Sequence, residues 1–427
     1  AVQNGGVSGT GGGLNFWFGA WTAQPKTFRN NISYDSGTLF GDVWHAFGAD
    51  YVHSNNSWDS AVTLTYADFL STDDSVLDNP RFPDGSLPET VFLKLANGSD
   101  LKNAGTNVGL PYSGANPDMG YVESTGNTYF LATTGNDGNS GTISLPWKTI
   151  EFASSQLNPA DILYIRGGTH RSSKANTIVN RFYINGMNGT SGNIITISNY
   201  PGETVVFNCD DVYVAGTAGD GPVGFKIENS SWFRLKGIRI TGLAQNPANI
   251  NSPCGFIVYD SDDWTIEQLE IDNIQGYGFY VQGTKNPGGI GCHRGLVLNC
   301  DVHDVGDVYS GWGGANGFQC TGADLSTDIT FRGCRAWRCS DDGFDLYSVD
   351  GVFRYENCWA FWNGYQPNVA PLTMAGDGMG FKLGPNDSDM TGSITKILHN
   401  CLSFENRRFG FDQNVSGAPT TQFQVYN

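Results

Sequence analysis

The chain of 427 residues is poor in charge, since only 15% of its residues are Asp, Glu, Lys or Arg. It also lacks any apolar run of about 18 residues or more, so the sequence predicts no membrane-spanning helix. Basic residues are scarce, 24 against 42 acidic ones, and the formal net charge is −18. Because nucleic-acid binding requires a basic face, this balance argues against nucleic acid as a partner. It does not exclude an acidic sugar, because a bound divalent cation can reverse the local field.

A signal peptide is not visible at Ala1-Val2-Gln3, so the sequence is interpreted as mature or processed. Asn-x-Ser/Thr sequons are typical of secreted glycoproteins. They begin at Asn31, Asn55, Asn97, Asn188, Asn229, Asn386 and Asn414. We therefore expect a secreted, extracellular protein.

What the chain does have is 57 Gly, 13% aromatic residues and an internal repeat. The repeat is clearest in Val297–His303, Phe331–Trp337, Tyr355–Phe361 and Leu398–Phe404. Each unit alternates apolar and polar residues with period two, and Asn or Gly marks a bend. Repeats of a few tens of residues with strand periodicity predict an all-β solenoid, in which each coil buries its face against the next coil.

Four cysteines share one position of this repeat, namely Cys300, Cys334, Cys358 and Cys401. In stacked coils they would form an inward ladder. Adjacent coils lie about 4.8 Å apart, a distance that suits both unbonded stacking and disulfides. We favour free, buried thiols, because cysteine is so often buried without a partner. The chain has nine Cys in all, so they cannot all pair within one molecule.

Three stretches resemble the family 9 polysaccharide lyases, pectate lyases with a right-handed parallel β-helix of ten coils. They are an opening segment at Thr128–Thr169, the motif Ser340–Tyr347, and the span from Gly380-Phe381-Lys382-Leu383-Gly384 to Gly410–Asn414. The resemblance implies the same β-helix, of roughly ten coils. A short helical pattern after Pro146-Trp147-Lys148-Thr149-Ile150 predicts one capping helix.

The order of segments departs from the family. Residues 80–123 resemble its closing segment, and joining Phe423–Asn427 to Ala1–Gly6 restores an ordinary coil. Strand-like pieces at residues 14–18 and 27–34 match the repeat. We therefore interpret the chain as circularly permuted: 1–123 corresponds to the family's C-terminal coils, 124–127 to a fusion linker, and 128–427 to the N-terminal cap and main body of one domain.

A permuted β-helix leaves an open sheet edge that something must cover. Residues 1–123 could dock on the last coils of their own chain. They could instead cover another copy and give head-to-tail assembly. We expect the monomer, because effective concentration favours closure within one chain.

The resemblance also implies calcium ligands at Asp341, Asp342 and Asp345, three carboxylates at a strand-end turn. Calcium takes six to eight oxygen ligands of this kind. The family's fourth aspartate is replaced by Asn316, whose amide oxygen can coordinate but carries no charge, so a lower affinity is expected. The alternative for Asp341-Asp342-Gly343 is a solvated turn without a metal.

Lys382 matches the family's catalytic base and follows Asp345 by 37 residues, which suits one long coil. Near calcium and cationic neighbours its pKa is expected to be lowered, as a neutral amine base requires. The alternative is a lysine on a solvated strand. Arg407 and Arg408 could bind a uronate carboxylate, or act only in the structure.

The leading hypothesis is a calcium-dependent lyase that cleaves pectate or a related polyuronate by β-elimination. A second is a weak or inactive extracellular β-helix that acts as a structural, filament-forming or glycan-binding subunit, favoured by Asn316 and the permuted order. A third is another carbohydrate enzyme, such as an epimerase or a hydrolase. A hydrolase would need paired carboxylic acids, for which Asp377 and Asp345 are candidates.

Overall fold

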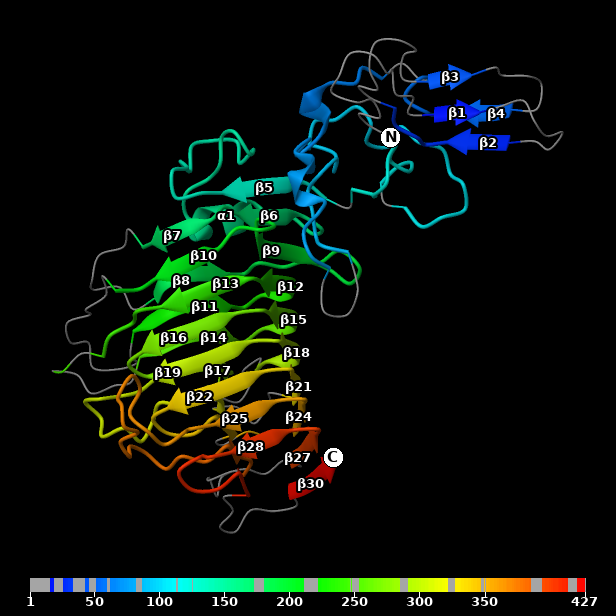
Figure 1. Ribbon diagram of the computed structural model, residues 1–427. Helices are drawn as coiled ribbons and strands as arrows, with labels where there is room; N and C mark the ends of the chain where they lie inside the picture. The colour runs from blue at the N-terminus through cyan, green and yellow to red at the C-terminus, as the bar shows by residue number, and fades with distance from the viewer. Residues whose placement is uncertain are drawn as a thin grey trace. The chain divides into compact units, whose positions relative to one another are not determined.

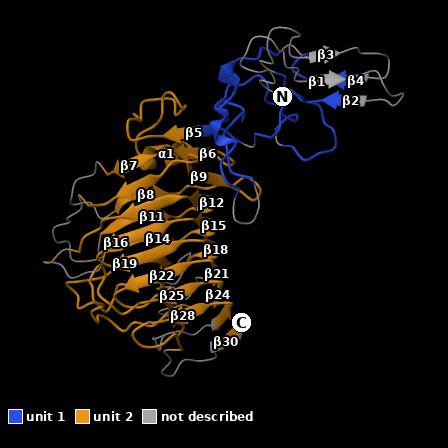
Figure 2. Cartoon of the chain, in the orientation of Figure 1, with its two compact units in different colours: residues 1–128 blue, residues 129–427 orange. Residues whose placement is uncertain are grey.

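We analysed a computed structural model of the chain (Figure 1). It describes residues 16–18, 26–33, 43–45, 51–59, 62–81, 87–112, 114–124, 126–172, 180–210, 222–245, 247, 253–284, 291–321, 327–346, 349, 351–384, 394–413 and 421–426. The proposed junction of Asn427 with Ala1–Gly6 lies outside these residues. The chain divides into two compact units, residues 1–128 and residues 129–427 (Figure 2). No helix of the described residues is long and apolar enough to cross a membrane.

The second unit is built from three parallel sheets. One sheet has ten strands, and we call it the long sheet. Its first strand, β5, begins at Thr128, which is the last residue of the first unit. Its strands, in chain order, are β5 (Thr128–Leu131), β6 (Ile162–Ile165), β9 (Ile195–Asn199), β12 (Ser231–Lys236), β15 (Asp262–Glu267), β18 (His293–Leu298), β21 (Thr327–Arg332), β24 (Gly351–Glu356), β27 (Ile394–His399) and β30 (Thr421–Tyr426).

The other two sheets have eight strands each. The β7–β28 sheet consists of β7 (Gly168–Arg171), β10 (Val205–Asn208), β13 (Ile238–Thr241), β16 (Glu270–Ile274), β19 (Asp301–Val305), β22 (Arg335–Cys339), β25 (Trp359–Phe361) and β28 (Leu402–Phe404). The β8–β29 sheet consists of β8 (Asn180–Asn185), β11 (Val223–Glu228), β14 (Cys254–Tyr259), β17 (Tyr277–Gln282), β20 (Phe318–Thr321), β23 (Phe344–Leu346), β26 (Phe381–Lys382) and β29 (Phe411–Asp412).

Each coil passes through the three sheets in turn, so residues one coil apart in the sequence become neighbours. The predicted parallel β-helix is therefore confirmed. An asparagine turn follows strands of the long sheet: Asn299, Asn357 and Asn400 have φ between 52° and 55°, a conformation that Asn tolerates. Their backbone N–H groups donate to the last residue of the next strand, for example Asn357 to His399 O at 2.9 Å.

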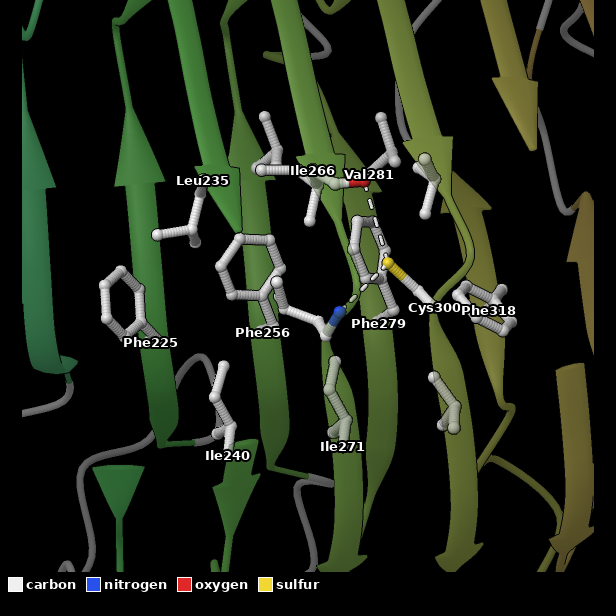
Figure 3. Close-up of a cluster of buried hydrophobic side chains, with 14 of the residues drawn as sticks. Phe225, Leu235, Ile240, Phe256, Ile266, Ile271, Phe279, Val281, Cys300 and Phe318 are labelled. Carbon is white, nitrogen blue, oxygen red and sulfur yellow. Dashed lines mark hydrogen bonds between the residues drawn. The ribbon is translucent and has the colours of Figure 1, made fainter. Parts of the chain in front are cut away.

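The core is a set of ladders in which like side chains stack from coil to coil. In Figure 3, Phe225, Phe256, Phe279 and Phe318 follow one another, with ring centroids 5.1 to 5.7 Å apart. The predicted cysteine ladder is present, and all nine cysteines are free thiols. Burial raises the pKa values of the Cys334 and Cys358 thiols well above that of an ordinary cysteine.

The expected short helix is α1 (Ile150–Gln156). The Thr149 side chain accepts from the Phe152 N–H, as an N-cap does. The buried residues Ile150 and Ala153 belong to the same core as the first coils.

The first unit, residues 1–128, contains two parallel strand pairs. β1 (Phe16–Phe18) pairs with β3 (Val43–His45), and β2 (Lys26–Arg29) pairs with β4 (Tyr51–Ser54). Short 3-10 helices, η1 (Tyr66–Asp68) and η2 (Asp74–Val76), follow. Its own small core consists of Ile32, Phe69, Leu95, Leu101 and Met119.

Candidate active site

The candidate site is the turn between β22 and β23, with the strands beside it. The turn carries Asp341 and Asp342, and Asp345 lies on β23. Phe344 and Leu346, on either side of Asp345, belong to the core, so Asp345 projects from the opposite face of the strand. On β26, the next strand of the sheet, Lys382 is the register partner of Asp345. The structure therefore brings together four of the residues that the sequence singled out.

Lys382 contacts two of the three aspartates. Its Nζ lies 3.1 Å from Asp342 Oδ2 and 3.4 Å from Asp345 Oδ2. Burial by itself lowers the pKa of Lys382. The negative charges of Asp345 and Asp342 have the larger combined effect, so the pKa is raised above the ordinary lysine value. The lowered pKa expected from the sequence applies to a lysine beside calcium and cationic neighbours, whereas without a metal the groups nearest to this ammonium are anionic.

The three carboxylates are almost fully buried, with relative exposures of 5% for Asp341, 0% for Asp342 and 3% for Asp345. Burial raises the pKa of all three above its usual range, and repulsion from Asp342 adds to the increase at Asp341 and Asp345. Three carboxylates with one ammonium carry a formal charge of −2. A buried cluster of that charge calls for a further cation.

The donor chemistry fits such a cation. Asp345 Oδ1 is buried and has no hydrogen-bond partner, and carboxylate oxygens are the ligands that calcium prefers. Among the described residues, however, no three acidic, His or Cys side chains converge in the spacing of a ready metal site. Two of the carboxylates point at Lys382 instead. The residues fit calcium in charge and in donor type. To bind the ion, Asp342 and Asp345 would have to turn from the Lys382 ammonium toward it.

Asn316 lies one coil earlier, in the turn before β20, as predicted. Its Nδ2 donates to Asp345 Oδ2 at 3.0 Å, and its Oδ1 accepts from the Asp342 N–H at 2.8 Å. The amide oxygen is therefore used by the backbone of the turn, and the amide nitrogen faces the carboxylate. In this orientation Asn316 links Asp345 and the Asp342 backbone, and its role as an oxygen ligand of calcium stays a prediction.

Asp341 and Asp342 also hold the loop at residues 376–380. Asp341 Oδ1 accepts from the Asp377 N–H, and Asp342 Oδ1 accepts from the Met379 N–H, both at 2.7 Å. The Arg407 guanidinium donates to Gly376 O. Arg408 Nη1 pairs with Asp377 Oδ1 at 2.9 Å, and both side chains are about half exposed. The two arginines thus anchor a loop beside the site, and Asp377 is engaged by Arg408.

Sequence reasoning missed the groups that support the turn. Ser340 Oγ lies 3.1 Å from Trp312 O and 3.3 Å from Asp307 Oδ1. Asp307 is only 1% exposed and also accepts from Ser310 Oγ at 2.6 Å. A signal was available, because Val305 is the register partner of Cys339. Asp307 therefore follows β19 at the same distance as Asp341 follows β22.

Taken together, the three sheets define a parallel β-helix protein, and its candidate site is a lysine set among buried aspartates. The chain belongs to the family described as Pel9A-like, right-handed beta helix region, whose profile matches residues 129–426.

Two relatives and two solved structures illustrate the similarity. The pectate lyase PEL9 of Emericella nidulans is 26% identical over 310 residues, which cover 67% of this chain and 69% of the relative. Pectate lyase L of Dickeya dadantii is 28% identical over 320 residues, and the match spans 70% of this chain but 64% of the relative. The crystal structure of pectate lyase Pel9A superposes with a TM-score of 0.53 and 26% identity, covering 70% of this chain and 69% of that one. A rhamnogalacturonan lyase gives the same score and identity, covering 66% and 69%.

Proposed function

We propose that the protein is a secreted, calcium-dependent polysaccharide lyase that cleaves pectate or a related polyuronate by β-elimination. The observation that carries the proposal is the position of Lys382 on β26, an amine within 3.4 Å of two buried aspartates, Asp342 in the turn and Asp345 on the neighbouring strand β23. The names of the relatives, pectate lyases and a rhamnogalacturonan lyase, support an acidic polysaccharide as the substrate.

The proposed reaction begins with removal of the proton at C5 of a uronate. Calcium held by the aspartates would offset the negative charges that raise the pKa of Lys382. Lys382 Nζ, as the neutral amine, then accepts this proton, and the electron pair of the C–H bond forms the C4–C5 double bond. The bond between C4 and the glycosidic oxygen breaks, and that oxygen leaves and takes up a proton. The C5 proton is only weakly acidic, so the base must lie within hydrogen-bonding reach of it.

Asp341, Asp342 and Asp345 are the residues that would hold calcium. When bound, the ion would neutralise the uronate carboxylate and so make the adjacent C5 proton more acidic. Asn316 would act by positioning Asp345 and the Asp342 backbone. Arg408 would exchange its exposed partner Asp377 for a substrate carboxylate, because a guanidinium binds either group in the same way.

The test is the ultraviolet absorbance of the unsaturated uronate product, followed with polygalacturonate in calcium and in chelator. The wild-type protein should give a rise that depends on calcium, and Lys382→Ala should abolish it. Because removing Lys382 leaves buried carboxylates unpaired, the variant is expected to lose about 3 kcal/mol of stability or more. Its circular dichroism spectrum must therefore be measured under the assay conditions. Asp377→Asn is the matched control and should retain the calcium-dependent rise.

The second candidate is a binding or structural subunit without turnover, and the amide of Asn316 facing Asp345 favours it. This candidate predicts no absorbance change with any uronate polymer, together with retention of the folded protein on a polygalacturonate column. A rise in reducing ends without the ultraviolet band would instead indicate hydrolysis. It would contradict both the lyase and the subunit without turnover.

A further inference from the structure

The candidate site is part of a longer row of side chains on the outer face of the β8–β29 sheet. Its members each come one residue after a rung of the ladder formed by Phe279, Phe318, Phe344 and Phe381, the first two of which appear in Figure 3. In order of coils, the members are Tyr280, Gln319, Asp345 and Lys382, which are register partners from strand to strand. Because successive side chains of a strand alternate between its faces, this row lies opposite to the core.

A second row contains the residues two positions before the same rungs, namely Tyr277, Asn316 and Asp342. Backbone bonds join them from coil to coil: the Gly278 N–H donates to Asn316 O at 3.0 Å, and the Gly317 N–H donates to Asp342 O at 2.9 Å. The two rows therefore place one pair of tyrosines two coils before Asp342 and Asp345. We call Tyr277 and Tyr280 the tyrosine pair.

The tyrosine pair lies together on the outer face. The two rings are stacked with their centroids 5.4 Å apart, and both are partly exposed. They pack against Val223, Cys254 and Ile257, which are at most 6% exposed and form an apolar cluster separate from the core. A tyrosine combines an apolar ring with a polar tip, and sites for small ligands are lined by such side chains with a few placed polar groups. The pair has the composition of a binding surface for a sugar ring.

The coil between the tyrosine pair and the aspartates carries two amides. Asn316 Nδ2 donates to Gln319 Oε1 at 3.2 Å, so the two side chains lie next to each other across the rows. Amides can donate to and accept from the hydroxyl groups of a sugar. The same face thus presents, coil by coil, an aromatic pair, an amide pair, and then the aspartates with Lys382.

The spacing of the coils suits a sugar polymer that lies across the strands. Neighbouring strands are about 4.8 Å apart, close to the length that one pyranose adds to an extended chain. Tyr280 and Lys382 are separated by three such spacings, or about 14 Å. A polymer whose reacting sugar lies at Lys382 would therefore bring the third sugar from it onto the tyrosine pair.

The electrostatics of the tyrosine pair suit an anionic polymer. Burial raises the pKa of Tyr277 to about 12, and the negative charges of Asp307 and Asp345 add to the increase. Burial also raises the pKa of Tyr280 well above its ordinary value. Both phenols stay protonated at neutral pH, so neither carries a charge that would repel a uronate.

We propose that Tyr277 and Tyr280 form an aromatic subsite that stacks against a sugar ring of an acidic polysaccharide, three sugars from the one at Lys382. The inference rests on the proposed function, because attack at Lys382 sets the register of the polymer. The tyrosine pair holds the polymer and takes no part in proton transfer. Its loss should therefore raise KM for long substrates and leave kcat nearly unchanged.

Steady-state kinetics with galacturonate oligomers of two lengths test the subsite, with calcium present and the ultraviolet band of the product as the signal. Tyr280→Ala should raise KM for the hexamer about tenfold, because one aromatic contact is lost. A trimer that covers Lys382 is too short to reach the tyrosine pair, so its KM should not change. Tyr280→Phe keeps the ring and should keep the wild-type KM for both oligomers.

Trp359→Ala is the matched control. Trp359 is also a partly exposed aromatic residue, at 45%, but it belongs to the β7–β28 sheet. Its neighbour Ala360 is fully buried in the core, so Trp359 faces outward from that sheet. This variant should leave both KM values unchanged. If Tyr280→Ala is not folded by circular dichroism, Tyr280→Leu keeps apolar packing without an aromatic face and should show the same increase in KM for the hexamer.

Affinity electrophoresis in gels that contain polygalacturonate separates the subsite from the lyase activity, since it requires no turnover. The wild-type protein should be retarded by the polymer, and Tyr280→Ala should be retarded less. This result in a protein without any absorbance change would support the subsite and contradict the lyase. If folded Tyr280→Ala keeps both the wild-type KM for the hexamer and the wild-type retardation, the subsite is overturned while the calcium-dependent lyase stands.

Discussion

At the scale of single residues, Asn316 sets the charge of the candidate site. Its side chain is uncharged, and its amide nitrogen satisfies one oxygen of Asp345. A fourth carboxylate at this position would face Asp345 across 3.0 Å. Because residue 316 is uncharged, the cluster without a metal is more stable than it would be with an aspartate there. A calcium ion bound by these residues would have one charged ligand fewer.

We predict that Asn316→Asp raises calcium affinity about tenfold, because calcium sites are tuned by the number of charged ligands. In chelator the same variant should be less stable than wild type by about 3 kcal/mol, since a buried carboxylate gains a like-charged neighbour. Isothermal titration calorimetry and thermal unfolding, each with calcium and with chelator, measure the two effects.

Asn363→Asp is the matched control for this prediction. Asn363 is also a fully buried amide in a turn of the β-helix, but its side chain bonds to Asn406 Oδ1 and the Cys339 N–H rather than to the aspartates. It should destabilise the protein in both conditions without raising calcium affinity. An Asn316→Asp variant with unchanged affinity would contradict a calcium site at the aspartates.

The repeat explains which parts of the site could be predicted from sequence. Asp345 and Lys382 are 37 residues apart, yet strand register makes them neighbours, and a repeat of one coil predicts this. The partners of Asn316, Arg407 and Arg408 could not be predicted in the same way. They are set by turns and by the loop at residues 376–380, where no period constrains the direction of a side chain.

At the scale of elements, the stacked ladders carry most of the stability of the β-helix. Each coil buries its apolar side chains only against the coils before and after it. The period-two pattern predicted these inward positions, and the core residues of β11, β14 and β17 agree with it (Figure 3). The first unit was harder to interpret, because irregular turns separate its short strands.

We predict that truncation within a ladder costs far more than truncation at its open end. Phe256→Ala, between Phe225 and Phe279, should lower the free energy of unfolding by about 3–5 kcal/mol through lost burial and a residual cavity. Phe411→Ala should cost about 1 kcal/mol, because nearly half of that ring is already exposed. Urea denaturation followed by circular dichroism compares the two. Equal costs would contradict this dependence on burial.

At the scale of the whole molecule, we propose that the order of segments is permuted relative to the family. The family profile begins at residue 129, and the strand pairs β1–β3 and β2–β4 precede it. Residues 1–123 would then correspond to the family's closing segment, and a chain with the two segments exchanged would follow the family's order.

A reordered chain tests this proposal. With residues 128–427 placed first and residues 1–123 joined after Asn427, β30 leads directly into the segment that contains β1–β4. We predict that this chain is more stable than the given order, because each added strand would bury apolar side chains against the coil before it. Its midpoint of thermal unfolding, followed by circular dichroism, should therefore lie above that of the given order. If both orders unfold at the same temperature, the permuted interpretation loses its physical basis.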